Sequence, residues 1–228
     1  MRIAARRELA STERQDRMAA RIDQVVTAGV NTWIIGDDEE VIVVDPGTDA
    51  EAVLAAAGER EILAVICTHG HAGHATAAFE VAERDEAPVA VHNADRLSWR
   101  EVHGRHDPDI EIEDGGVFEV ADVTLEVLHT PGHSAGSVCL YCEELKAVFC
   151  GDLLAADGVV TSDDGFSNFA RQLSSIGENL LTLAPETRVL PGHGPEFTVA
   201  AAEKNFDTWV SAGPGAGLAA DPGEDDED

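Results

Sequence analysis

Three histidines stand within six residues, directly after an apolar run, and this feature constrains the fold more than any other. The run Ile62–Cys67 is long enough for a buried strand, and Thr68-His69-Gly70-His71-Ala72-Gly73-His74 follows it. Residues two apart on extended backbone face the same way, so His69 and His71 can converge on one point. Imidazole is the commonest protein ligand for zinc-like metals. The sequence therefore predicts a metal centre at the end of a strand.

Three later segments also place a possible ligand beside glycine at the end of a strand. They are Thr130-Pro131-Gly132-His133, Phe149-Cys150-Gly151-Asp152 and Pro191-Gly192-His193-Gly194. Glycine lets the backbone turn sharply and approach a small ion closely. One such segment alone is usually only a turn, but together with the first cluster they predict one site built from histidines and an aspartate.

Short strands alternate with helices along the chain, which predicts a layered α/β architecture. The predicted strands are Trp33–Ile35, Val41–Val44, Ile62–Cys67, Pro88–Val91, Gly116–Val120, Val123–His129, Ser137–Cys142, Ala147–Cys150 and Val189–Leu190. Helices are predicted over residues 49–57, 73–84 and 166–183. Cys139 and Cys142 should point to opposite faces of one strand, and we expect all four cysteines to be small core residues without disulfides.

The length of 228 residues suits one sizeable domain, and a hydrophobic fraction of 44% is ample for its core. We expect an N-terminal extension over residues 1–20, read as a short helix or loose segment with Met18 as an alternative start. A folded domain over 21–210 and a disordered acidic tail over 211–228 should follow. With no apolar run near membrane-spanning length and no signal-peptide pattern, we expect a cytoplasmic protein without a membrane partner.

The net charge of the chain disfavours some classes of binding partner. The formal net charge is −29, with 44 acidic against 15 basic residues. Such a surface repels phosphate backbones and anionic membranes, so we expect no nucleic-acid partner and a small-molecule substrate instead. The acidic surface is explained by solubility and requires no specific partner. The sequence makes no prediction of the oligomeric state.

On these motifs the chain resembles the metallo-β-lactamase superfamily, and within it the short glyoxalase II-like hydrolases of bacteria. The signature is His-x-His-x-Asp-His, then a histidine, a bridging aspartate and a final histidine. Its metal-ligating positions are here His69, His71, His74, His133, Asp152 and His193. The resemblance covers about Ile22 to Trp209 and implies a four-layer αββα sandwich with the metals at one edge of the two sheets. It also implies that Asp45 holds the ligand loop in place without being a metal ligand itself.

The chain departs from the signature at Gly73, where the family has an aspartate. The resemblance implies one intact site of His69, His71 and His133 with Asp152 bridging. A second site would keep His74, His193 and Asp152, which with a bridging hydroxide makes four ligands, enough for zinc. We therefore expect one or two zinc ions, the second bound more weakly, with iron as an alternative. Asp152 and His74 are the residues expected to act in catalysis.

The expected reaction is hydrolysis by a metal-bound hydroxide that attacks a carbonyl carbon. The resemblance favours a thioester of glutathione or a similar low-molecular-weight thiol. Only 35 residues follow His193, so the helical domain with which longer glyoxalase II enzymes grip glutathione is expected to be absent. The alternatives are a mononuclear iron persulfide (sulfur) dioxygenase, a lactonase, or a non-catalytic ligand-binding member of the fold. A β-lactamase is disfavoured by the missing export signal, and a nuclease by the charge.

The remaining histidines and one acidic pair are expected to lie outside the ligand set. We predict that His92 caps or packs at a strand end and that His129 is structural. His103 and His106 are predicted to lie in a polar loop that can border the site, and Asp163-Asp164 to be solvated.

Overall fold

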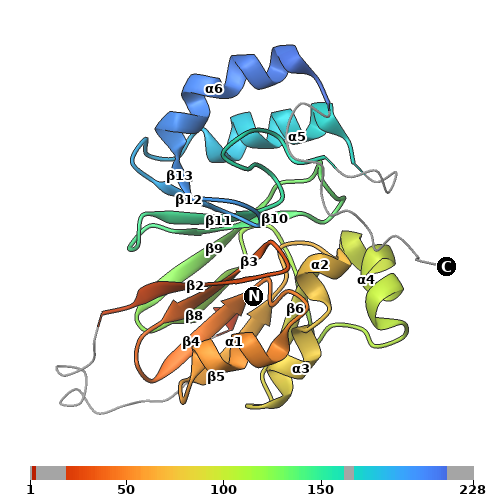
Figure 1. Cartoon of the computed structure of the whole chain (residues 1–228), viewed down its shortest axis with the longest axis vertical. Coiled ribbons are helices and arrows are strands. Elements are labelled where there is room, and N and C mark those ends of the chain that lie inside the picture. Colours follow the sequence, from red (N-terminus) through yellow and green to blue (C-terminus); the bar gives the residue numbers. More distant parts are fainter. Residues whose placement is uncertain (1, 4–18, 162–166, 215–228) are drawn as a thin grey trace.

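Two mixed β-sheets pack face to face, and helices cover the outer face of each sheet (Figure 1). The computed structural model describes residues 2–3, 19–161 and 167–214. One apolar cluster fills the space between the sheets, and a further cluster lies beneath the helices on each outer face. The predicted four-layer αββα sandwich is therefore confirmed.

The first sheet has six strands, antiparallel at its beginning and parallel from β4 onward. In spatial order they are β2 (Arg21–Thr27), β3 (Val30–Gly36), β4 (Glu40–Val44), β5 (Glu61–Ile66), β6 (Val89–His92) and β7 (Ile110–Ile112). The helices on this side of the molecule are α1 (Ala50–Ala57), α2 (Ala72–Ala75), α3 (Ala78–Glu83) and α4 (Arg96–His103). Ile35 and Ile42 face the second sheet, whereas Ile34 and Val43 face the helices. Burial on both faces explains the unbroken apolar runs of these strands.

The second sheet has seven strands, with two parallel pairs, β1 with β8 and β11 with β12. In spatial order they are β1 (Arg2–Ile3), β8 (Val117–Val120), β9 (Val123–His129), β10 (Val138–Cys142), β11 (Ala147–Gly151), β12 (Arg188–Pro191) and β13 (Phe197–Thr198). Its outer face carries α5 (Phe169–Ser175), a π-helical turn (Ile176–Leu180) and α6 (Val199–Ala212).

Two predicted helices have a different form in the structure. The helix predicted over 73–84 is divided into α2 and α3, because the N–H of Ala77 donates to Gly47 O at 2.9 Å and the chain turns there. The helix predicted over 166–183 begins at Phe169, after Asn168 caps it with its side chain, and changes to the π-helical turn at Ile176. At the first of these places a tertiary contact has overridden local periodicity.

Several other segments differ from the prediction or were not predicted. The prediction that His103 lies in a polar loop is wrong, because His103 is the last residue of α4. The same helix buries Trp99. The pair β13 and α6 was not predicted, and α6 continues to Ala212. Arg2–Ile3 pairs with β8 where a helix or loose segment was expected. The rest of the predicted extension up to residue 18 and the tail from 215 lie outside the described residues.

The cysteine prediction is confirmed, since all four are free and buried. Cys142 packs between the sheets, whereas Cys139 packs beneath the helices of the second sheet, so the two do face opposite ways. Within the described residues, no helix combines the length and the apolar composition needed to cross a bilayer.

Candidate metal centre

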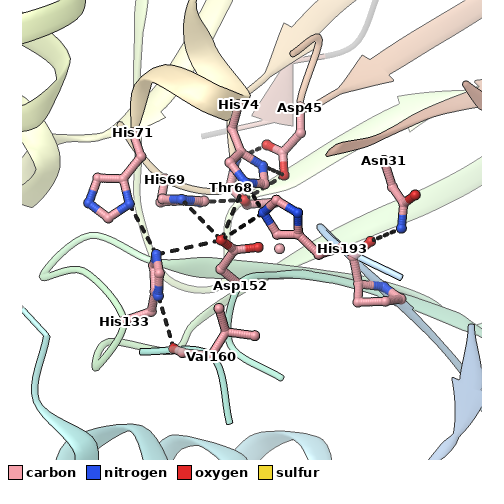
Figure 2. A network of polar contacts seen from close by, with 12 residues as sticks. Asn31, Asp45, Thr68, His69, His71, His74, His133, Asp152, Val160 and His193 are labelled. Atoms are coloured by element: carbon pink, nitrogen blue, oxygen red, sulfur yellow. Dashed lines mark hydrogen bonds and ion pairs between the residues drawn. The ribbon is translucent and has the colours of Figure 1, made fainter. Parts of the chain in front are cut away.

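The six predicted ligands meet at one edge of the sandwich, although they come from four separate loops (Figure 2). His69, His71 and His74 follow β5, and the other three ligands follow β9, β11 and β12. The carboxyl ends of β5 and of the parallel pair β11 and β12 therefore deliver ligands to the same place, as the strand-end positions predicted.

The ligands form two groups. The first group is His69, His71 and His133, and the second group is His74, Asp152 and His193; within each, the ligand atoms lie within 4.8 Å of one another. In the first group His133 Nε2 is 3.0 Å from His71 Nδ1. In the second group His74 Nε2 is 3.3 Å from His193 Nε2. Gly73 lies in α2 immediately before His74 and brings no carboxylate to the second group.

Asp152 lies between the two groups. Its Oδ2 is 3.3 Å from the Nε2 atoms of both His74 and His193. The same oxygen is 3.7 Å from His133 Nε2 and 4.0 Å from His69 Nε2. A single buried carboxylate oxygen therefore faces both groups, as a bridging ligand must.

The donor set fits a divalent transition metal. His69 Nε2 and Asp152 Oδ1 are buried, and neither has a hydrogen-bond partner among the described residues. Buried polar atoms without partners are uncommon in folded proteins and require an explanation. Five imidazoles and one carboxylate are ligands that zinc and iron accept, and a metal would account for these atoms.

Four of the five imidazoles are turned the same way by oxygen atoms behind them. The Nδ1 atoms of His69, His74, His133 and His193 lie within 3.1 Å of Thr68 Oγ1, Asp45 Oδ2, Val160 O and Gly29 O, respectively. A hydrogen bond from Nδ1–H sets the tautomer and leaves Nε2 free to ligate. His71 has the opposite orientation, with Nδ1 toward His133.

Asp45 contacts the ligand loop and is buried beside it. It is 1% exposed and takes a backbone φ of 51°. Oδ1 accepts the N–H of Thr68 at 2.7 Å, and Oδ2 accepts the hydroxyl of Thr68 at 2.8 Å. Oδ2 also lies 3.1 Å from His74 Nδ1, so one carboxylate orients ligands from both groups. The ligand atoms of Asp45, His69 and His74 are also close enough together for a metal site. Both oxygens of Asp45 are, however, already engaged by Thr68 and His74.

Sequence reasoning missed Asn31, which holds the loop of the last histidine. Its side-chain amide donates to Pro191 O at 3.0 Å and to Gly194 O at 2.8 Å, on either side of His193. Its backbone N–H donates to Gly192 O at 2.7 Å. A lone asparagine in a strand has no sequence signal for this role, because its partners lie about 160 residues away.

The charges in the centre are strongly coupled. Burial lowers the pKa of His69 well below its usual range, and the imidazoles of His74 and His133 add to this. Burial also lowers the pKa of His133. For Asp152 burial acts in the opposite direction, but His74 and His193 outweigh it and hold the pKa of Asp152 well below its usual range. Burial disfavours the charged form of His74, yet the carboxylates of Asp152 and Asp45 raise its pKa to about 10.

Metal uptake is therefore expected to release at least one proton. In the metal-free protein His74 is protonated below about pH 10, and its Nε2 must lose the proton before it can ligate. Affinity at the second group should rise with pH, by about tenfold per unit for each proton displaced. Calorimetric titration with zinc at pH 7, in two buffers of different ionisation enthalpy, measures the protons released. Equal heats in both buffers would contradict the expectation.

The other histidines lie outside both groups. His92 accepts the N–H of Ala94 and its ring stacks on His129 with centroids 4.2 Å apart, so the prediction of a capping or packing residue is confirmed. His103 and His106 pack on Phe79, with ring centroids 5.0 and 3.7 Å away. Asp163 and Asp164 lie outside the described residues.

Comparison with known proteins shows the family to which the chain belongs. Residues 26–193 match the family model described as the metallo-beta-lactamase superfamily. The chain is 34% identical to the Probable metallo-hydrolase YqgX of Bacillus subtilis over 184 residues, which are 74% of this chain and 87% of the relative. It is 25% identical to the hydroxyacylglutathione hydrolase GloC of Haemophilus influenzae over 198 residues, covering 80% and 93% of the two chains.

Two solved structures are similar over most of their length. BLEG-1, a B3 metallo-beta-lactamase, aligns with a TM-score of 0.74 and 26% identity, covering 83% of this chain and all of BLEG-1 (100%). TTHA1623, solved in a di-iron-bound form, aligns with a TM-score of 0.69 and 29% identity, covering 81% and 97% of the two chains.

Proposed function

The chain belongs to the metallo-beta-lactamase superfamily, and from this premise we propose that it is a metal-dependent hydrolase acting on a thioester of a low-molecular-weight thiol. The observation that carries the proposal is the position of Asp152 Oδ2, which faces the imidazoles of both groups from 3.3 to 4.0 Å. Likeness to YqgX supports a hydrolase, and the weaker likeness to GloC supports a thioester.

The residues present fit a metal in each group. His69, His71 and His133 would hold one ion, His74 and His193 the other, and Asp152 would contact both. When bound, a divalent metal lowers the pKa of a coordinated water and polarises a carbonyl oxygen, so it supplies both a nucleophile and an electrophile.

The side chains themselves contribute the orientation of the ligands. Oxygen atoms behind His69, His74, His133 and His193 keep Nε2 turned inward, so the ligands need not reorganise during a reaction. Asp152 Oδ1 is buried without a hydrogen-bond partner among the described residues. A metal ion held by the two groups would give this oxygen, or Oδ2 beside it, a partner. Asp152 and His74 remain the proposed catalytic residues.

One specific observation favours a second candidate, a mononuclear iron persulfide dioxygenase. Gly73 removes a carboxylate from the second group, whereas His69, His133 and Asp152 of the other half are all present. The di-iron form of TTHA1623 supports iron as a metal that this type of site accepts. We rank this candidate second because the second group retains its two histidines and Asp152.

The test is a substrate panel offered to zinc-loaded and iron-loaded protein. We expect release of free thiol from thioesters such as S-lactoylglutathione, detected with a disulfide reagent, and loss of that release in His133→Ala. Lactones are offered in parallel. Oxygen consumption with glutathione persulfide, without thioester hydrolysis, would instead favour the dioxygenase. No turnover above the His133→Ala background on any substrate would overturn the proposal of an enzyme.

Restoring the missing carboxylate should strengthen the second group. Gly73→Asp is expected to tighten binding of the second metal by about 10–100-fold, the range typical of groups that support a metal site. Zinc affinity measured by competition with a chromophoric chelator checks this. The matched control is Ala72→Asp, which adds the same charge one residue earlier at an exposed position of α2. Equal gains in both variants would show that charge alone, not ligation, is responsible.

A further inference from the structure

Asp95 is a buried carboxylate that makes contact with two of the ligand loops. It is 3% exposed and lies where a short 3₁₀ turn, Asn93–Asp95, meets α4. Oδ2 accepts the N–H of Gly70, between His69 and His71, at 2.9 Å. The same oxygen accepts the hydroxyl of Ser134, the residue after His133, at 2.7 Å. Through one oxygen atom, Asp95 joins the two loops that supply the first group.

The other oxygen completes the contact with the second of these loops. Oδ1 accepts the N–H of Gly136 at 2.5 Å. All three groups that face the carboxylate act as donors, and no lysine or arginine pairs with it in the described part of the chain. A carboxylate, which only accepts, satisfies the arrangement, whereas an asparagine would turn an NH₂ group toward an N–H.

Asp95 does not serve its own helix. An aspartate at the position before a helix usually accepts backbone N–H groups of the first turn. Here the side chain makes no such bond. The hydroxyl of Ser98 donates to Asp95 O instead, at 3.0 Å. The side chain is therefore directed away from α4 and toward the ligand loops.

Two glycines allow this close approach. A Cβ atom at Gly136 would lie 2.7 Å from Asp95 Cγ. A Cβ atom at Gly70 would lie 2.7 Å from Ser98 Oγ and 3.0 Å from Trp99 N. The residue between His69 and His71 must consequently be small, because the start of α4 packs directly against it.

We infer that Asp95 is a positioning residue for the first group, holding the loop of His69 and His71 at a set distance from the loop of His133. The second group is held differently, since Asn31 and Gly29 fix the loop of His193. Each group therefore has a support of its own in addition to Asp45, which both groups share. This inference rests on the proposed function only in treating these histidines as metal ligands.

The test measures metal binding without any substrate. Asp95→Asn keeps the size of the side chain but places an NH₂ group against one of the three donors that face it. The affinity of the first group for zinc is expected to fall by about 10–100-fold. The assay uses a His193→Ala background, in which the second group is disabled. A shifted or weakened cobalt absorption spectrum should accompany the loss, since it reports ligand geometry, which a purely structural role would leave unchanged. Asp107→Asn removes the same charge from an exposed site and should bind zinc normally.

A second variant keeps the inference testable if Asp95→Asn does not fold. Ser134→Ala removes one of the three contacts and should weaken zinc less, in the same direction. Normal zinc affinity and a normal cobalt spectrum in a folded Asp95→Asn variant would overturn the inference while leaving the proposed hydrolase intact. Weakened zinc in a protein whose parent binds zinc but hydrolyses no thioester would support the inference and refute the proposed function.

Discussion

An Asp152→Ala variant is expected to lose metal from both groups and about three orders of magnitude or more in catalytic rate, because a bound metal contributes several kcal/mol to the transition state. The reason is geometric. Oδ2 of Asp152 is within 3.3 Å of the Nε2 atoms of His74 and His193 and 3.7 Å from that of His133. Among the described residues no other carboxylate lies with both groups of histidines except Asp45, whose oxygens are already engaged. Its removal also lowers the pKa of His74, which Asp152 and Asp45 hold at about 10 against the effect of burial.

Metal content per chain, measured by elemental analysis after dialysis, checks the expected loss directly, and thioester turnover checks the rate. Asp157→Ala is a matched control, since Asp157 is an exposed carboxylate five residues later in the same loop region. If Asp152→Ala retained both metals, the assignment of the bridging residue would be wrong.

Asp45→Ala should have the largest effect on stability. Its carboxylate accepts the backbone N–H and the hydroxyl of Thr68 and contacts His74 Nδ1, all in a buried environment. Truncation leaves two or three buried donors without partners, and each costs about 1–3 kcal/mol. We expect the free energy of unfolding of the metal-free protein to fall by about 3–5 kcal/mol, the range for breaking a buried charged pair.

Denaturant unfolding in the presence of a chelator measures this change without a contribution from bound metal. Asp49→Ala is the control from the same segment, because Asp49 is an exposed N-cap of α1 that bonds the N–H of Ala52. Its loss should cost about 1 kcal/mol. Equal losses in the two variants would mean that Asp45 is an ordinary capping carboxylate, and zinc binding to Asp45→Ala would then be unchanged.

Much of the fold could be predicted from local pattern. Strands such as β4 and β5 are apolar on both faces, and their runs are bounded by turn residues, so their positions agree with prediction to within a residue or two. The helix pattern was less reliable. Residues 73–84 have helical periodicity throughout, but a hydrogen bond from Ala77 to Gly47 divides them. The helix α4 is so polar that its single buried tryptophan, Trp99, was not recognised as a core anchor.

The sequence by itself determined the donor set of the centre. Histidine and aspartate are recognisable by type, and glycines beside them at the ends of apolar runs mark where strands deliver them. Only the tertiary structure decided how these side chains are held. Asn31 meets Pro191 across 160 positions of sequence, and Asp95 meets Gly136 across 41. Such contacts depend on how the two sheets and their loops pack together, and hydrogen bonds of this kind leave no periodicity in the chain. The chemistry of the site is thus local, whereas its geometry is a property of the whole fold.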